Sequence, residues 1–490
     1  MISEILFSLL FMSILEVATN IRLVNASGTI YIRADGSIDP PTANITTVDN
    51  ISYTFTGNIY DSIIVERDNI LINGANYTLQ GPGTGPGYTK GIAFSGRTNV
   101  TVKNMEIKVF YMGVHLYGTS NAIISRNNIT NCEYGVYASK ATNNTISTNN
   151  IINNEYHGIL VEYSSNNNIS GNTIIGSDLG FGLSDSVNVL LEENVIENNT
   201  CGFSFSGFEL RHFAHSIDTS NLVNGKPFYY LENQKDLAIN PVTYPQVGYL
   251  VLINCTNATI QGLTLTSNGQ GLLVVNSNVS RITGNNVTDN GEGVALFQSS
   301  LNSLDNNRIE NNTFEGIALV SSSDNNTIHG NYIADCSWGV ALLDSIDNRF
   351  YHNDFIDNTQ QVWIESSSYA NVWDDGYPSG GNYWSDHNPL DIYSGSYQNE
   401  TGRDKIGDIP YVIDENNTDR YPLIYPYGYV PSADLNDDET VNILDAIILA
   451  TAFGSKPGDP NWNPYADINQ DGRVNILDAI ILAGHFGETV

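Results

Sequence analysis

A repeat of about 22 residues fills the middle of the chain, and this period restricts the fold to a solenoid of stacked, similar coils. Its first marker is an apolar residue that, in most copies, lies two positions after an Asn. This marker recurs at Ile107, Ile129, Ile151, Ile174 and Ile196, and it resumes at Leu265, Val287, Ile309, Ile333 and Phe355. A second marker, a Gly followed by an apolar residue, keeps the same register from Gly113 to Gly339. Two independent markers in one register argue against coincidence.

The repeat is built from strands. Alternating stretches such as residues 113–117 and 293–297 indicate strands with one buried face. Three strands of about four residues with their turns account for one coil, so equivalent positions stack about 4.8 Å apart in parallel sheets. A leucine-rich horseshoe would need helices between the strands, and no 3.6-residue periodicity is present. We therefore predict an all-β fold, a right-handed parallel β-helix over residues 27–363, with Ile129, Ile151, Ile174 and Ile309 facing inward.

The bends and the interruptions of the solenoid can also be placed. Asn-Asn pairs such as 127–128 and 285–286 are expected at bends, where Asn tolerates the left-handed backbone and stacked amides form ladders. The pattern breaks near residues 208–247, which we expect to leave the coil as an insertion. Residues 364–430 are aromatic and rich in turns, and they are expected to serve as a cap or linker after the last coil.

The N-terminal residues indicate where the protein is located, and its net charge restricts the partners it can bind. Residues 5–15 form an apolar run too short to span a membrane, and Val24-Asn25-Ala26 supplies a small-x-small cleavage pattern. We expect residues 1–26 to be a signal peptide, and the mature chain to be extracellular, with no transmembrane anchor. The net charge is −33. Such a polyanion repels nucleic acid and anionic membranes and favours calcium and neutral or cationic partners.

The C-terminus, residues 431–490, contains one motif twice. Asp434 and Asp467 each begin a stretch that reads as a calcium loop, with oxygen donors at positions 1, 3, 5, 9 and 12 and a backbone carbonyl at position 7. Each loop is followed by the same nine residues, Asn-Ile-Leu-Asp-Ala-Ile-Ile-Leu-Ala, which predict an amphipathic helix. We expect two Ca²⁺ ions, held by Asp434, Asn436, Asp438, Thr440, Asn442 and Asp445 in the first loop and by Asp467, Asn469, Asp471, Arg473, Asn475 and Asp478 in the second.

Both parts resemble known families. The repeats, the stretch Val-Asn-Gly-Lys-Pro-Phe-Tyr-Tyr at 223–230 and Gly-Asn-Tyr-Trp-Ser-Asp at 381–386 resemble the NosD-type secreted β-helix proteins with carbohydrate-related repeats, which share the pectin-lyase-like fold. The duplicated loop and helix resemble type I dockerins, with paired EF-hand-like calcium loops in a small all-α module. This second resemblance implies binding to a cohesin domain of another protein, through loop positions 10 and 11. Those positions are Ile443, Leu444, Ile476 and Leu477.

The sequence leaves catalysis open. The residue two positions after the first marker forms a column that includes Asp335 and Asp357, which would lie on adjacent coils about 5 Å apart. Such a pair could share a proton, act as acid and nucleophile on a sugar, or bind calcium. We favour the interpretation that both are turn residues whose side chains bind backbone amides. Two functions remain: a non-catalytic protein that binds polysaccharide, and a glycoside hydrolase or polysaccharide lyase. The four Met, the four Cys and the scattered His form no cluster of soft ligands in the sequence, so a copper-maturation role is the less favoured alternative.

Overall fold

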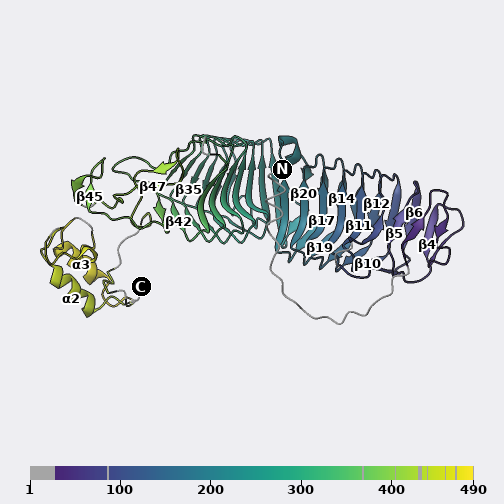
Figure 1. Ribbon diagram of the computed structural model, residues 1–490, viewed down its shortest axis with the longest axis horizontal. Coiled ribbons are helices and arrows are strands. Elements are labelled where there is room, and N and C mark those ends of the chain that lie inside the picture. The colour runs from purple at the N-terminus through teal and green to yellow at the C-terminus, as the bar shows by residue number, and fades with distance from the viewer. Residues whose placement is uncertain are drawn as a thin grey trace.

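The computed structural model describes residues 28–84, 88–366, 369–402, 404–428, 433–436, 438, 440–457, 459–469 and 472–488. The expected signal peptide, residues 1–26, lies outside the described residues. Almost all of the regular structure before residue 365 is β-strand, wound into a parallel solenoid, and two short helices lie near the C-terminus (Figure 1). Among the described residues, no helix is long and apolar enough to span a membrane.

Three long sheets form the N-terminal part of the solenoid, and one of them continues to its end. Sheet A contains, in spatial order, β2 (Ile38–Asp39), β1 (Ile30–Ile32), β5 (Ile63–Val65), β8 (Lys90–Ala93), β11 (Met112–Tyr117), β14 (Tyr134–Ser139), β17 (His157–Glu162), β20 (Leu179–Ser184) and β23 (Cys201–Ser206). Sheet B contains β24 (Ser216–Ile217), β21 (Leu190–Glu192), β18 (Asn168–Ser170), β15 (Thr145–Ser147), β12 (Ile123–Ser125), β9 (Val100–Lys103), β6 (Ile70–Asn73), β4 (Ser52–Phe55) and β3 (Ile45–Thr47).

Sheet C has 14 strands and joins the two parts of the solenoid. Its first strands are β7 (Thr78–Gln80), β10 (Glu106–Lys108), β13 (Asn128–Thr130), β16 (Asn150–Ile152), β19 (Thr173–Ile175), β22 (Val195–Glu197) and β25 (Leu222–Val223). Its remaining strands are β26 (Lys226–Glu232), β28 (Tyr249–Ile253), β31 (Gln270–Val275), β34 (Glu292–Phe297), β37 (Glu315–Val320), β40 (Trp338–Leu343) and β43 (Gln360–Ile364).

Two six-stranded sheets complete the C-terminal part of the solenoid. Sheet D contains β27 (Ala238–Ile239), β29 (Thr259–Gln261), β32 (Arg281–Thr283), β35 (Ser303–Asp305), β38 (Thr327–His329) and β41 (Arg349–Tyr351). Sheet E contains β30 (Thr264–Thr266), β33 (Asn286–Thr288), β36 (Arg308–Glu310), β39 (Tyr332–Ala334), β42 (Asp354–Ile356) and β44 (Tyr383–Trp384). The other elements are the hairpins β45 (Tyr393–Ser394) with β46 (Glu400–Thr401) and β47 (Tyr411–Val412) with β48 (Thr418–Asp419), the 3-10 helices η1 (Leu210–Phe213) and η2 (Pro464–Ala466), and the helices α2 (Ile443–Ala452) and α3 (Ile476–Gly484).

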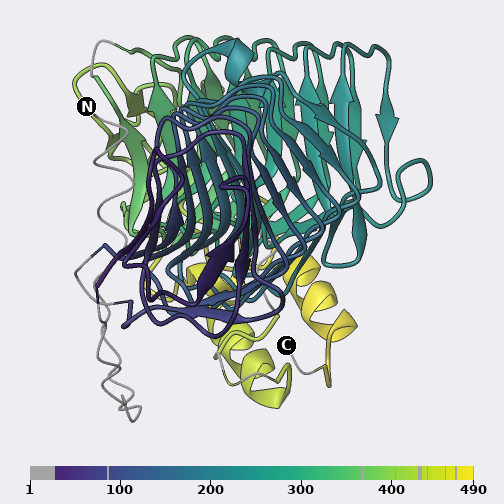
Figure 2. The same ribbon diagram turned by 90° about the vertical axis from the view of Figure 1, so that its right-hand side faces the viewer.

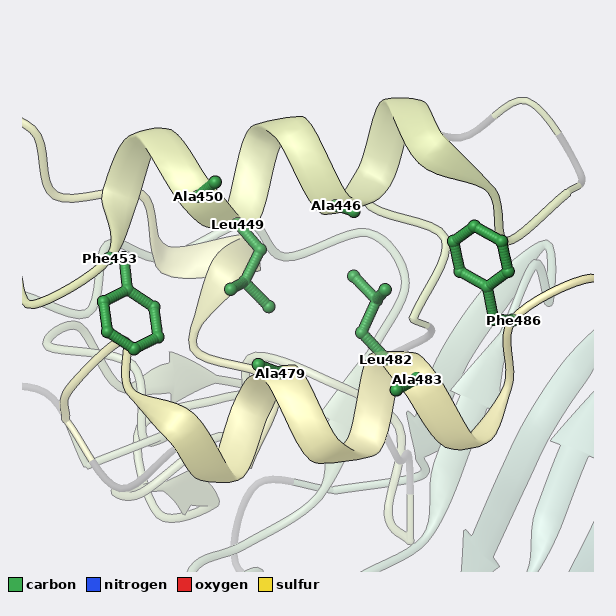
Figure 3. Close-up of a pocket in the computed structure, with 8 residues that line it drawn as sticks. All are labelled: Ala446, Leu449, Ala450, Phe453, Ala479, Leu482, Ala483 and Phe486. Carbon is green, nitrogen blue, oxygen red and sulfur yellow. The ribbon is translucent and has the colours of Figure 1, made fainter.

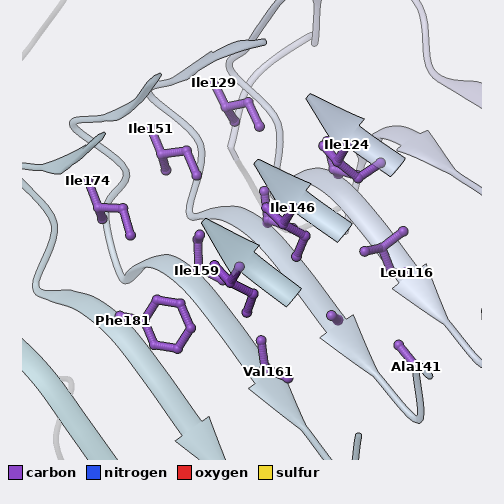
Figure 4. Packing of buried hydrophobic residues seen from close by; sticks show 14 of the residues in the cluster. Leu116, Ile124, Ile129, Ala141, Ile146, Ile151, Ile159, Val161, Ile174 and Phe181 are labelled. Atoms are coloured by element: carbon purple, nitrogen blue, oxygen red, sulfur yellow. The ribbon is translucent and has the colours of Figure 1, made fainter. Parts of the chain in front are cut away.

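The predicted core is confirmed. Ile129, Ile151, Ile174 and Ile309 are all fully buried, and on sheet C Ile129 pairs with Ile151, and Ile151 with Ile174. Figure 4 shows Ile129, Ile151 and Ile174 stacked in one column, turn after turn, with residues of sheets A and B such as Val161 and Ile146 facing them. Each fully buried Ile contributes about 1.5–3 kcal/mol, and stacking repeats that contribution along the axis.

Asparagine ladders run along the bends, as predicted. The buried Asn127 donates from Nδ2 to Oδ1 of Asn149, and Asn149 does the same to Asn172, each at 3.0 Å. The same pattern links Asn285 to Asn307. The left-handed position is the residue before each ladder member, Arg126 in the first case, with φ of 56°. Ladder amides therefore satisfy the backbone groups that every bend would otherwise leave unpaired.

The sequence predicts that the segment near residues 208–247 is an insertion outside the coil. Much of it instead belongs to the solenoid, because it supplies β24, β25, β26 and β27. At its centre the hairpin between β25 and β26 reverses the chain direction, so the strands before and after it are antiparallel within sheet C. Asn224 and Gly225, with φ of 49° and 72°, form the tight turn. We call the part before this hairpin, residues 30–223, the N-terminal solenoid, and the part after it, residues 226–364, the C-terminal solenoid.

The reversal places the two interiors on opposite faces of sheet C. In β28, Leu250 and Leu252 belong to the core of the C-terminal solenoid, whereas Tyr249, Val251 and Ile253 belong to that of the N-terminal solenoid. The two solenoids are accordingly displaced sideways when viewed along the axis (Figure 2). The outward face of one solenoid therefore closes the end of the other.

The aromatic segment after the last turn packs on the open end of the C-terminal solenoid. Trp373 stacks on Phe350 with 4.3 Å between ring centroids, and Trp384 stacks on Phe355 with 4.4 Å. Both Trp side chains are buried. Buried Asp419 accepts a hydrogen bond from the indole nitrogen of Trp384 at 2.9 Å. These contacts protect the last strands from water and from pairing with other chains.

Candidate functional sites

The structure brings Asp335 and Asp357 to one place on adjacent turns. Both occupy the left-handed bend that precedes sheet C, with φ of 52° and 48°. The backbone N–H of Asp335 donates to the carbonyl of Ile356 at 3.2 Å, and that of Asp357 donates to the Ser385 hydroxyl at 2.8 Å. The same bend holds Asn or Asp in the same conformation in most other turns, and Val109, Gly176 and Ser267 take that conformation in others. The backbone therefore explains these residue types without any catalytic role.

The two aspartates nevertheless line a shallow, open hollow of about 400 Å³. Its lining is polar and comes from three successive turns: Asn311, Asn312, Thr313, Asp335, Cys336, Ser337, Asp357 and Thr359. Both carboxylates are exposed. Such a hollow offers acceptors and donors for sugar hydroxyls, and its two carboxylates lie one turn apart.

A cluster that the sequence analysis did not single out lies on the outer face of sheet A. Eight rings gather there, and we call this surface the tyrosine face: Tyr88, Tyr111, His115, Tyr117, Tyr134, Tyr137, Tyr156 and His157. The repeated Tyr one or two positions before the marker Gly, as in Tyr111-Met-Gly and Tyr134-Gly, is the signal that could have found it.

Burial sets the charge of this face. Burial, together with the nearby Glu155, raises the pKa of Glu133 to about 7. Desolvation lowers the pKa of His115 and of His157 to about 4, so both imidazoles are neutral at physiological pH. Nδ1 of each histidine is buried with no hydrogen-bond partner in the described part of the chain. The face therefore carries neutral rings beside acceptor carboxyl groups.

The C-terminal module consists of two matched halves. Asn442 caps α2 by accepting from the N–H of Leu444, and Asn475 caps α3 by accepting from that of Leu477, both at 2.8 Å. In each half the last carboxylate of the loop, Asp445 or Asp478, is fully buried. Asp445 accepts backbone N–H groups of Leu435 at 2.7 Å and of Asn442 at 2.7 Å, so it ties the two ends of the loop together.

The halves also exchange backbone hydrogen bonds. The N–H of Gly487 donates to the carbonyl of Val441, and that of Gly454 donates to the carbonyl of Val474, both at 2.7 Å. Val441 and Val474 donate in return to Glu488 and Ser455, at 3.0 Å each. Each loop is thus attached to the end of the other helix. Neither half completes its hydrogen bonds without its twin.

The predicted partner-binding residues are exposed in matched pairs. Ile443 and Ile476 are 62% and 61% exposed, and Leu444 and Leu477 are 50% and 51% exposed. Ile447 and Ile480, one turn further along each helix, are exposed as well and were missed from the sequence. Between the helices lies an open apolar hollow of about 600 Å³ (Figure 3). Its lining repeats the same positions in both halves: Ala446, Leu449, Ala450, Phe453, Ala479, Leu482, Ala483 and Phe486.

The expected calcium ligands, apart from Asp471, lie among the described residues. Every expected donor is a carboxylate, amide or carbonyl oxygen, which is the donor set that Ca²⁺ prefers. Oδ2 of Asp467 accepts the N–H of Gly472 at 2.9 Å, so the second loop turns back on its first residue. In the described parts of the chain, no three His, Cys, Asp or Glu side chains gather closely enough to hold a metal ion. The donor chemistry fits calcium, and the coordination itself stays a prediction.

Comparison with known proteins separates the same two parts. The profile of the NosD family, described as periplasmic copper-binding protein (NosD), matches residues 48–221 and 214–389. The profile of the dockerin type I domain matches residues 432–486. No curated protein matches the chain.

Solved structures show only distant similarity. The periplasmic alginate epimerase AlgG is 14% identical, over 71% of this chain and 82% of its own, with a TM-score of 0.29. An alginate lyase from Paenibacillus sp. str. FPU-7 is 11% identical, over 65% and 98%, with a TM-score of 0.27. The A-module of the mannuronan C-5 epimerase AlgE6 of Azotobacter vinelandii is 16% identical, over 66% and 87%, with a TM-score of 0.25. These similarities are too weak to bear on function.

Taken with the strands and the duplicated helices, the profile matches define the class of protein, a parallel β-solenoid joined to a dockerin domain. The chain belongs to the NosD family, and its C-terminal domain is a type I dockerin.

Proposed function

We propose that this protein is exported from the cell, binds polysaccharide on its solenoid, and is anchored through its dockerin domain to a cohesin-bearing partner or assembly. The pair of matched apolar patches on α2 and α3 carries the proposal. Exposed Ile and Leu side chains at equivalent positions of two halves are costly to leave in water, and they form a surface suited to a protein partner.

The anchoring depends on two Ca²⁺ ions in this proposal. The loops that hold the expected ligands lead directly into the helices that carry the patches. Without calcium, the acidic side chains of each loop repel one another, and the loop loses the geometry that positions the helix. Removing calcium should therefore disconnect the protein from its partner.

Binding of the full chain to a panel of immobilised cohesin domains tests the anchoring. We expect capture in calcium and release in a chelator. Because the patches are equivalent, changing Ile443 and Leu444 together to Asp should weaken capture only about twofold, and the same change at Ile476 and Leu477 should do likewise. The fourfold variant should not be captured. Val412→Asp, an exposed apolar residue outside the dockerin, is the control. Chelator-resistant capture would contradict the proposal.

Cleavage of polysaccharide, by hydrolysis or by a lyase reaction, is a second candidate function, favoured by the polar hollow around Asp335 and Asp357. Retaining glycosidases place their two carboxyl groups about 5 Å apart, which is close to the spacing of adjacent solenoid turns. On a polysaccharide that the protein is shown to cleave, Asp335→Asn or Asp357→Asn should abolish product release without loss of folding. Unchanged release would leave both as turn residues. We include no copper site in either function.

A further inference from the structure

The tyrosine face carries one tyrosine ring from each of four successive turns, at positions that differ by one or two residues in the strand register. Tyr88, Tyr111, Tyr134 and Tyr156 come from successive turns, and their ring centroids are separated by 4.7, 5.5 and 5.9 Å in that order. The planes of Tyr111 and Tyr156 are tilted by 56° and 64° from that of Tyr134. Because these rings are not stacked flat on one another, part of each ring surface is left uncovered by its neighbour.

Polar groups surround these rings. The Lys140 ammonium donates to the Tyr117 hydroxyl at 3.1 Å, and the Tyr137 hydroxyl donates to the Glu162 carboxylate. Glu133 and Glu155 precede the strands β14 and β17 at the edge of the same face. Apolar ring surface next to hydrogen-bonding groups suits a ligand that is itself amphipathic, with C–H faces and hydroxyl edges.

We propose that the tyrosine face binds a neutral, extended polysaccharide whose chain runs along the solenoid axis with one sugar ring per turn. The inference rests on the proposed polysaccharide function and assigns it a place and a substrate class. The turn-to-turn distance of about 4.8 Å is close to the length of one pyranose unit in an extended chain. The repeat that builds the fold thus sets the spacing of the contacts.

Charge selects the class of glycan. The carboxyl groups Glu155 and Glu162 equal the nearby cations Lys90 and Lys140 in number, and Glu133, with its pKa raised to about 7, adds a partial negative charge. The whole chain carries a net charge of −33. The negative charge of the protein would repel an acidic glycan both at long range and on the face itself, whereas a neutral glycan experiences no such repulsion. Burial of Glu133, which raises its pKa to about 7, further suits this group to uncharged hydroxyl partners.

Titration of the full chain with neutral β-linked hexasaccharides of glucose, mannose and xylose, and with a hexamer of mannuronate, tests the proposal. We expect a neutral hexasaccharide to bind and the acidic one to bind at least tenfold more weakly. Affinity for shorter neutral oligosaccharides should rise with each sugar up to about four, because four tyrosines lie on successive turns. Flat affinity beyond a disaccharide would overturn the axial arrangement.

Substitutions locate the site. Tyr156→Ala should weaken binding roughly tenfold, the upper range for one aromatic contact, and Tyr156→Phe should retain most of it. Tyr332→Ala is the matched control, because Tyr332 is a half-buried tyrosine on the outer face of the C-terminal solenoid, packed against Arg308. Thermal unfolding of each variant separates lost binding from lost folding.

The outcomes distinguish the site from the function. If the wild type binds a neutral glycan and Tyr156→Ala and Tyr117→Ala bind it equally well, the site lies elsewhere, and the proposed function stands. If the wild type binds only the mannuronate hexamer, the proposed site fails and the polysaccharide function stands. If it binds none of the four glycans, both fail, whereas cohesin capture is unaffected. A second copy of the chain as the occupant would appear as self-association that Tyr156→Ala removes, and it would also overturn the proposal.

Discussion

The ring of Phe213 packs against the ring of Phe297, with 4.9 Å between their centroids. Phe213 ends η1, which follows the last strand of sheet A in the N-terminal solenoid, and Phe297 ends β34 in the C-terminal solenoid. Phe297 is on the outward side of sheet C in its own solenoid, yet it is only 6% exposed. Both rings belong to the core of the N-terminal solenoid, so the contact places the outward side of a C-terminal strand inside that core.

Removing this contact should destabilise both solenoids together. Phe213→Ala deletes a buried ring from a cluster that also contains Phe205, and such a deletion costs about 3–5 kcal/mol. Chemical denaturation followed by tyrosine fluorescence and by circular dichroism should show both signals shifted to lower denaturant by the same amount. Phe208→Ala is the control, since Phe208 is 58% exposed. An unchanged midpoint for Phe213→Ala would show that the solenoids do not depend on each other.

Much of this fold could be predicted from the sequence, because each turn repeats the same local requirement. Ile151 occupies the apolar position that every copy of the repeat has, so its side chain is expected to face the core. The bend before it is expected to need a left-handed backbone in every copy. The Asn-Gly turn at 224–225 is also a local hairpin signal, and the continuous apolar run 249–253 indicates a strand buried on both faces. Their consequence, two interiors on opposite faces of one sheet, depends on how the halves pack and could not be read from either signal alone.

The sequence predicted exposed residues of the dockerin but not those of the tyrosine face. Ile443 and Leu444 could be named because they belong to a motif repeated in the sequence. Tyr134 and His157 could not, since they come into contact only because the step between these two residues is one residue longer than the step from Met112 to Tyr134. Outer faces of a solenoid tolerate many residue types, so a functional cluster there is recognised by its contacts rather than by its period.

Replacing Ile151 by Asp should unfold the neighbouring turns. Ile151 is fully buried among stacked isoleucines, so the variant loses an apolar contact and places an unpaired carboxylate in the core. A loss of about 4–5 kcal/mol or more is expected. Ile152→Asp is a matched control one position along β16, because Ile152 lies on the outer side of the same strand and is only half-buried. Differential scanning fluorimetry of the two variants would refute the packing scheme if both melted alike.

The free energy of unfolding should fall as the pH rises above the ordinary pKa of a glutamate side chain. Burial raises the pKa values of Glu292 and Glu315, on adjacent strands of sheet C, above the usual 4.5. Groups around Glu292 include Gln270, whose Nε2 donates to it at 3.1 Å, and the carboxyl group of Glu315. A raised folded-state pKa means that the folded protein holds the proton more tightly. The associated stability is present below about pH 4.5 and is lost as pH rises through the folded-state values.

The measurement compares melting temperatures between about pH 5 and about pH 8. The wild type should lose more stability over this interval than Glu292→Gln, whose amide does not titrate. Glu365→Gln, at an exposed site, should follow the wild type. Parallel curves for the wild type and Glu292→Gln would mean that Glu292 is ionised in the folded protein.

The two calcium loops should differ in affinity, and the second should fill first. Gly472, at position 6 of the second loop, has φ of 80°, which confirms that this position takes the left-handed backbone. The first loop has Glu439 there, outside the described residues, and a left-handed Glu costs about 1–2 kcal/mol more than Gly. That difference corresponds to roughly tenfold weaker binding, which the extra negative charge of Glu439 offsets in part.

Calorimetric titration of the calcium-depleted full chain should show two unequal steps. Glu439→Gly should bring the steps together, whereas Glu415→Gly, a change of equal charge outside the dockerin, should leave them apart. Two identical steps in the wild type would contradict the idea.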